Sequence, residues 1–280
     1  AVVHAAGCTA TWPNRSALVH RVNVTGTRNV VEAALCMAVS RFVHVSSAGV
    51  FAPGTREVPG DERRLRSVGR HKLGYTRSKA LAHQLVAEAA KTRGLPATIV
   101  APTFMFGPHD AGPTSGKVIL AAYNGLLPGL PPGGRNFVSV KDVAAAIGLA
   151  LERDVVGEAF IAGGSNLSYP ELCSVIARVS GASIRVPPVL SPFAVRSVGM
   201  LGSAKAAFTR RPPKLTYHLA RLATADQFYS SQKARQMLGY RPRSVEEAVQ
   251  SAFEWFRDNG YLKPGLVRVG AATRNGTPVP

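Results

Sequence analysis

Short apolar runs alternate along the first half of the chain with longer segments in which apolar residues recur at helical spacing. Three apolar or β-branched runs are typical of buried strands: 1–6, 41–46 and 97–101. Apolar residues three or four positions apart predict helices over 15–38 and 72–93, and Gly94 is placed to end the second one. This order predicts an α/β fold with a parallel sheet covered by helices on both faces.

The second half of the chain mixes short strands with helices. Apolar runs predict strands at 137–140 and 159–162. Three patterns open helices: Asp142 as the N-cap of a helix to about residue 153, and the capping boxes Ser168–Glu171 and Ser244–Glu247. Residues 263–280 show no periodicity, so we expect a flexible tail there.

The composition is that of a folded, strongly basic protein. Of 280 residues, 46% are apolar, and 34 Lys and Arg against 16 Asp and Glu give a net charge of +18. The densest basic stretch, 63–72, contains no aromatic residue and no nucleic-acid-binding motif, so we interpret it as a solvated loop and expect no nucleic-acid partner. Three distant cysteines form no CxxC pair, which disfavours a metal site and fits a reducing, cytoplasmic location.

The sharpest chemical pattern is Tyr75 with Lys79, one helical turn apart on the predicted helix. A free phenol has a pKa near 10, and a nearby cation lowers it by about 1–3 units, so we expect Lys79 to lower the pKa of Tyr75. Ser46 ends the strand at 41–46 and Ser47 follows it, at the sheet edge where doubly wound folds bind ligands. The alternative, a helix surface and a polar strand exit, stays open.

Seven ordered motifs extend this pattern. They are Val3–Gly7, Asn23–Asn29, Val45–Val50, Tyr75 with Lys79, Pro102–Pro108, Phe137–Val143 and Lys233–Pro242. From residue 1 to about 262 the chain resembles the extended short-chain dehydrogenases/reductases of the epimerase, 3β-hydroxysteroid dehydrogenase and dihydroflavonol-reductase branch. Residues 107–110 and 240–262 are most similar to its hopanoid-associated, sugar-epimerase-like subgroup.

The resemblance implies a Rossmann-like fold, NAD or NADP as cofactor, and a catalytic triad of Ser47, Tyr75 and Lys79 with Tyr75 as general acid/base. It implies ten cofactor-binding residues: Ala5, Ala6, Gly7, Asn23, Ser46, Tyr75, Lys79, Pro102, Thr103 and Phe104. It also implies contacts of Ser47, Phe104 and Arg135 with a small-molecule substrate. For Arg135 the alternative, a solvent-exposed arginine, stays open.

The resemblance divides the chain into a partial cofactor-binding domain at 1–135 and, at 136–262, a smaller substrate lobe with interleaved core elements. No GxGxxG turn occurs in the sequence, and its first strand resembles the fourth strand of such a sheet. We therefore expect the chain to be truncated by about 60 residues or more. In that case residues 1–280 bind NAD(P) poorly.

Ser47 is followed by Ala48, Gly49 and Val50 rather than by the Asp–Glu pair of the related sugar-nucleotide dehydratases, which disfavours dehydration. We expect oxidation of a secondary alcohol or reduction of a ketone. Phe104 and the apolar segments 126–130 and 187–201 favour a hydrophobic, sterol-like or polycyclic substrate. A nucleotide-sugar 4-epimerase and a non-catalytic truncated remnant stay open as alternatives.

Residues 187–211 also permit contact with a membrane surface. The segment carries Leu190, Phe193, Val195, Val198, Met200 and Leu201, followed by Lys205, Arg210 and Arg211. An apolar face flanked by cations is typical of interfacial helices. Helices of substrate lobes show the same pattern. Peripheral membrane contact and a homodimer therefore stay open.

Overall fold

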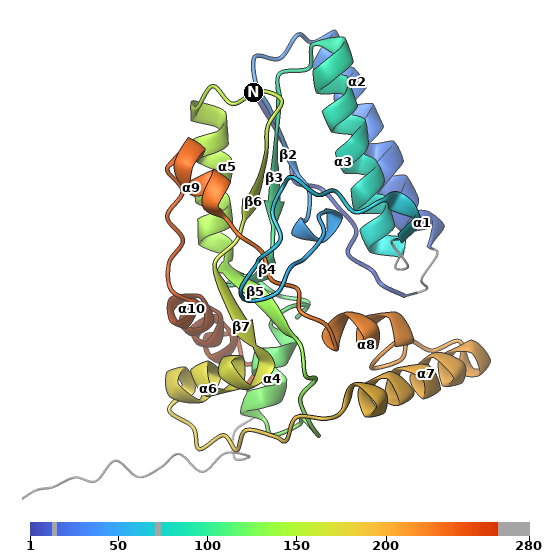
Figure 1. Ribbon diagram of the computed structural model, residues 1–280, viewed down its shortest axis with the longest axis vertical. Coiled ribbons are helices and arrows are strands. Elements are labelled where there is room, and N and C mark those ends of the chain that lie inside the picture. Colours follow the sequence, from blue (N-terminus) through green and yellow to red (C-terminus); the bar gives the residue numbers. More distant parts are fainter. Residues whose placement is uncertain (13–15, 71–73, 263–280) are drawn as a thin grey trace, which may run out of the picture.

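The computed structural model describes residues 1–12, 16–70 and 74–262, and two sheets form its framework (Figure 1). The larger sheet has four parallel strands in the order β1-β2-β3-β6. Their bounds are β1 (Val2–His4), β2 (Phe42–Val45), β3 (Ala97–Pro102) and β6 (Ala159–Ala162). Every residue of β3 is buried, which explains its continuous apolar sequence.

Helices cover both faces of this sheet (Figure 1). On one face, α2 (Gly26–Cys36) and α3 (Gly74–Arg93) pack on Phe42 and Ile99. On the other, α5 (Val140–Glu152) and α9 (Gln232–Leu238) pack on Val43, Val100 and Phe160. The predicted doubly wound α/β fold is confirmed.

Two predicted helices differ from the structure in detail. The helix expected at 15–38 is α1 (Ala17–His20) and α2 joined by a π-helical turn at Arg21–Thr25. The expectation that Asp142 caps its helix is wrong. Ser139 is the N-cap of α5, and buried Asp142 instead accepts hydrogen bonds from the backbone and guanidinium of Arg243.

The second sheet is built from strands that mostly carry too few residues to show a pattern. It contains β4 (Phe104–Phe106), β5 (Gly134–Ser139) and β7 (Ser165–Ser168), with β5 parallel to β4 and antiparallel to β7. Three helices form a core with it: α4 (Lys117–Tyr123), α6 (Tyr169–Ser180) and α10 (Val245–Asp258). The capping box predicted at Ser168 and Glu171 opens α6.

Two further helices, α7 (Pro192–Thr209) and α8 (Tyr217–Ala223), lie side by side at the edge of the molecule (Figure 1). β5 spans the boundary expected at residue 135, and β6 returns from the second half of the chain to the larger sheet. The tail expected at 263–280 lies outside the described residues. Among the described helices, none is long and apolar enough to span a membrane.

Candidate active site

Tyr75 and Ser47 meet where the chain leaves β2 and α3 begins. Ser47 follows β2 and caps the short 3-10 turn Ala48–Val50, with its Oγ accepting from Gly49 N at 3.3 Å. A hydrogen bond with this hydroxyl lowers the pKa of half-buried Tyr75, but desolvation raises that pKa more. The phenol is therefore neutral at physiological pH and can donate a proton.

Lys79 lies one turn further along α3 and is buried, with 6% of its surface exposed. Its Nζ donates to the carbonyl oxygen of Val45 at 2.9 Å, and burial lowers its pKa. The expectation that Lys79 lowers the pKa of Tyr75 is wrong for this structure, because Ser47 is the group that lowers it. An ammonium has three N–H donors, so Lys79 can bind a further acceptor while it stays on Val45.

Asn23 connects the loop after β1 to the start of α3. It lies in the π-helical turn, a feature frequent at functional sites, and is 2% exposed. Its Oδ1 accepts from Cys8 N at 2.7 Å, and its Nδ2 donates to Cys8 O and to Ser78 Oγ, each at 2.9 Å. Ser78 in turn donates to the carbonyl oxygen of Tyr75. Asn23 therefore fixes the backbone on both sides of the candidate site.

The loop after β1 forms a cradle open to solvent. Ala5, Ala6 and Gly7 are exposed, and a Cβ built on Gly7 would lie 3.3 Å from Lys79 Nζ and 3.4 Å from Asn23 Oδ1. Glycine thus leaves room for a ligand against the ammonium. The geometry fits the nicotinamide–ribose half of a dinucleotide, whereas the sequence holds no glycine-rich turn for the pyrophosphate half.

The segment Pro102–Phe104 connects the two sheets. Ser46 directly precedes Ser47 in the chain and is buried. Thr103 Oγ1 donates to Asn136 Oδ1 at 2.8 Å, and Ser46 Oγ bonds His83 Nδ1 at 3.0 Å. Both hydroxyls thus have protein partners in this structure.

Arg135 packs against residues of the second sheet and of α6 rather than extending into solvent. Its guanidinium lies 5.1 Å from the ring centroid of Phe104, and its Nε donates to the Tyr169 hydroxyl at 2.9 Å. Phe104 itself packs edge-on against Phe106 and Phe137. Arg135 and Phe104 therefore form one contact at the second sheet.

The apolar segments expected to border the substrate do meet each other. Leu130 N donates to Pro188 O, and Leu127, Pro128 and Pro187 line a pocket of about 710 Å³. Ser47, Tyr75 and Lys79 are not among the residues that line it. The structure therefore places this pocket away from the triad.

Three buried histidines lie behind the candidate triad, and sequence reasoning assigned them no part in the site. His4 and His44 stack in register on β1 and β2 with ring centroids 5.4 Å apart, and His83 on α3 bonds Ser46. Burial lowers the pKa of all three, that of His83 to about 4. In the described part of the chain, no three such side chains are placed to hold a metal ion. The sequence signal for His4 and His44 is a histidine inside a strand-like run, whereas His83 lies in the predicted helix.

The neutral histidines should make the fold sensitive to acid. His83 has a pKa of about 4 when folded and about 6.5 when unfolded, so the unfolded chain takes up the proton first as the pH falls below 6.5. Its contribution of about 3 kcal/mol to the free energy of unfolding is then lost between pH 6.5 and 4. Urea denaturation at several pH values measures the free energy of unfolding. Between pH 6.5 and 4 this free energy should fall less steeply with falling pH in His83→Gln than in the wild type.

Exposed His109 provides the matched control. Its backbone has φ of 69°, a region that Asn tolerates. The free energy of unfolding of His109→Asn should therefore change with pH as it does in the wild type. Equal slopes for His83→Gln and the wild type would contradict the assignment of this acid sensitivity to His83.

Comparisons with known proteins agree with this geometry. The model of the NAD dependent epimerase/dehydratase family matches residues 1–163. Sterol demethylase protein B of Methylococcus capsulatus is 30% identical over 248 residues, covering 86% of this chain and 74% of the relative. The crystal structure of gox2253 superposes with a TM-score of 0.79 at 32% identity, covering 93% of this chain and 79% of that one. A nucleoside-diphosphate-sugar epimerase from Pseudomonas aeruginosa gives 0.70 at 29% identity, covering 86% and 76%.

Proposed function

The chain belongs to the NAD dependent epimerase/dehydratase family, and from this premise we propose that it is an NAD(P)-dependent oxidoreductase. The reaction interconverts a secondary alcohol and a ketone on a hydrophobic, sterol-like or polycyclic compound. One observation carries the proposal: the Tyr75 hydroxyl is hydrogen-bonded to Ser47 at the carboxyl end of β2, with Lys79 buried one turn away.

In ketone reduction, Tyr75 donates its phenolic proton to the carbonyl oxygen, and in alcohol oxidation it takes that proton back. Ser47 holds the same substrate oxygen through its hydroxyl. When bound, a nicotinamide dinucleotide supplies or accepts the hydride at the carbinol carbon. Lys79, with N–H groups beyond the one on Val45, holds a ribose hydroxyl in the cradle at Gly7.

Two observations support a hydrophobic substrate. Phe104 begins β4 two residues after the carboxyl end of β3, and its half-buried ring packs against Phe106 and Phe137. A relative of 30% identity is a sterol demethylase protein. An apolar ring at this place favours an apolar ligand because its surface is removed from water on binding.

A nucleotide-sugar 4-epimerase is the second candidate, favoured by one feature of the site. Arg135 lies on Phe104 with its guanidinium half-buried, and such a group can bind a diphosphate. A nucleoside-diphosphate-sugar epimerase is also among the similar structures. An epimerase uses Tyr75 twice, first to take a proton and then to return it, with no net change in the dinucleotide.

Steady-state assays with two substrate classes test the proposal. With a 3-keto steroid, the absorbance of NADH or NADPH at 340 nm should fall in step with substrate consumption. With a uridine-diphosphate sugar, neither the dinucleotide nor the sugar should change. Epimerisation of the sugar at a constant NADH concentration would replace the proposal with the second candidate.

A further inference from the structure

Helix α7 is apolar on two opposite faces, although a surface helix normally has one apolar face. Its inner face carries small side chains at Val195, Gly199 and Ala206, all buried. A Cβ built on Gly199 would lie 2.6 Å from Cβ of Ala220, so α8 packs closely on this face. The inner face therefore packs on α8 at Gly199.

The outer face of α7 carries large apolar side chains that the described residues leave exposed. Phe193 is 81% exposed, Leu201 67% and Phe208 90%, and Met200 is also exposed. They follow one another at i, i+7, i+8 and i+15, which places them on one stripe of the helix. We call these four residues the outer stripe. Single exposed apolar residues are common, but a continuous stripe of four marks an interaction surface.

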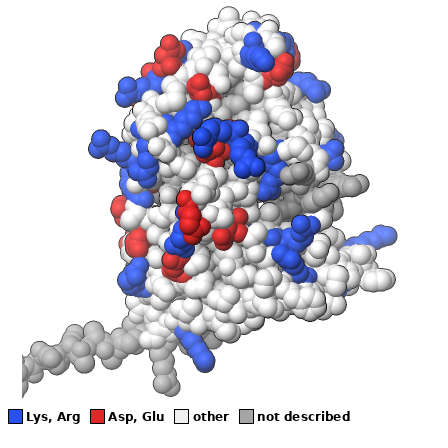
Figure 2. Space-filling view, viewed as in Figure 1, with Lys and Arg blue, Asp and Glu red and all other residues white. Residues whose placement is uncertain are grey.

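Charge around the outer stripe has one sign. From residue 181 to 225 the sequence contains no Asp or Glu but carries Arg185, Arg196, Lys205, Arg210, Arg211, Lys214 and Arg221. By helical geometry, Arg196 and Lys205 lie on either side of the stripe, and Arg210 follows its end. Figure 2 shows basic but no acidic side chains over the part of this face where α7 and α8 lie.

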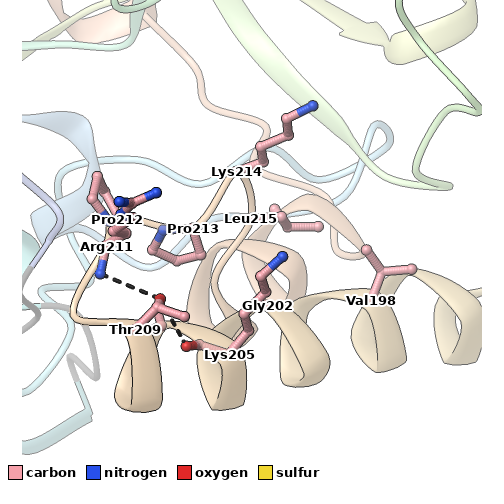
Figure 3. A pocket seen from close by; sticks show the side chains of 10 residues that line it. Val198, Gly202, Lys205, Thr209, Arg211, Pro212, Pro213, Lys214 and Leu215 are labelled. Carbon is pink, nitrogen blue, oxygen red and sulfur yellow. Dashed lines mark hydrogen bonds between the residues drawn. The ribbon is translucent and has the colours of Figure 1, made fainter.

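Some of these cations also line a pocket on the side of α7 turned away from the outer stripe. The pocket, of about 700 Å³, lies between the second half of α7 and the returning segment 211–215 (Figure 3). Lys205, Arg211 and Lys214 are at its walls, and Ala206 and Leu215 give it apolar surface. Cations next to apolar surface suit a ligand with an anionic head and an apolar body.

We propose that α7 is a peripheral membrane-binding element that lies in the surface of an anionic phospholipid bilayer. The outer stripe is buried among the acyl chains, while Arg196 and Lys205, on either side of it, contact the lipid phosphates. Charge complementarity selects this occupant over a second copy of the chain, because two such surfaces of the same sign repel each other. The inference does not depend on the proposed oxidoreductase activity.

Co-sedimentation of the 280-residue protein with vesicles tests this proposal without any turnover. Vesicles of phosphatidylcholine alone are compared with vesicles of phosphatidylcholine and phosphatidylglycerol in a ratio of about three to one. We expect binding to the anionic vesicles, weaker binding as salt is raised, and little binding to the neutral ones. Phe193→Ser, Leu201→Ser and Phe208→Ser combined should lower binding to anionic vesicles at least about tenfold.

A matched variant separates the outer stripe from exposed apolar surface in general. Met37, Val58 and Leu126 are 75%, 74% and 65% exposed and lie outside α7, so changing all three to Ser should leave vesicle binding within about twofold. Circular dichroism confirms that both triple variants are folded. The proposal is overturned if the wild type does not bind anionic vesicles, if it binds neutral ones equally well, or if both triple variants bind alike. A dimer that the stripe variant converts to a monomer, without vesicle binding by the wild type, also overturns it.

Discussion

Tyr75→Phe is expected to lower kcat about a thousandfold, within the range typical of losing a general acid or base. The substitution removes the one hydroxyl that can pass a proton to the substrate oxygen while it keeps the ring in place. The Kd of the dinucleotide should change by less than about threefold, because the Tyr75 ring stays in place and Lys79 keeps its contact with the ribose. Stopped-flow reduction of a 3-keto steroid together with a fluorescence titration of NADPH measures both quantities.

Tyr217→Phe is the matched control, since Tyr217 begins α8 and is 37% exposed. It makes the same chemical change away from the candidate triad, so its kcat should stay near the wild-type value. A Tyr75→Phe protein with kcat within tenfold of the wild type would remove Tyr75 from its proposed role. A dinucleotide that no longer binds would instead assign Tyr75 to cofactor binding.

A glycine-rich nucleotide-binding unit joined ahead of Val2 is expected to raise the affinity for NADPH about a hundredfold or more. The gain comes from the pyrophosphate, since each hydrogen bond to a charged group contributes about 1.5–3 kcal/mol and such a turn supplies several. β1 is an edge strand of the larger sheet, so an added strand has backbone groups with which to pair. Kinetic assays are best made on this extended protein.

The measurement is isothermal titration of NADPH into residues 1–280 and into the chain extended with a strand, a GxGxxG turn and a helix. A second extension, with its glycines changed to valine, is the control and should bind as weakly as residues 1–280. Equal affinity of all three proteins would show that the site at Gly7, Asn23 and Lys79 needs no pyrophosphate contact.

The fold was predictable where one pattern extends over many residues. The periodicity of α3 and the apolar runs of β2 and β3 gave these elements nearly their observed ends, and Gly94 ends α3 with φ of 70° as expected. β4 and β7 have only three and four residues, too few for a period to show. Asp142 was misassigned because Ser139 and Asp142 can both cap a helix, and only the contact with Arg243, far along the chain, decides between them.

The candidate triad was predictable because Tyr75 and Lys79 share one helix and Ser47 ends one strand. Its environment was not, since it depends on contacts between distant segments. Asn23 reaches Ser78 across 55 residues, and the direction of the Lys79 ammonium depends on the carbonyl group of Val45. Sequence spacing brings Lys79 close to Tyr75, but it does not show that burial would raise the pKa of the phenol.

The fate of a deuterium label tests the central claim most directly, namely that hydride passes between a nicotinamide and the carbinol carbon of a hydrophobic substrate. The extended protein is given NADPH with deuterium in place of both hydrogens at C4 and a 3-keto steroid, and the products are analysed by mass spectrometry. We predict one deuterium at the new carbinol carbon for each dinucleotide oxidised, and far less of this labelled product with Tyr75→Phe. A label that stays in the dinucleotide while a nucleotide sugar is epimerised would contradict the account.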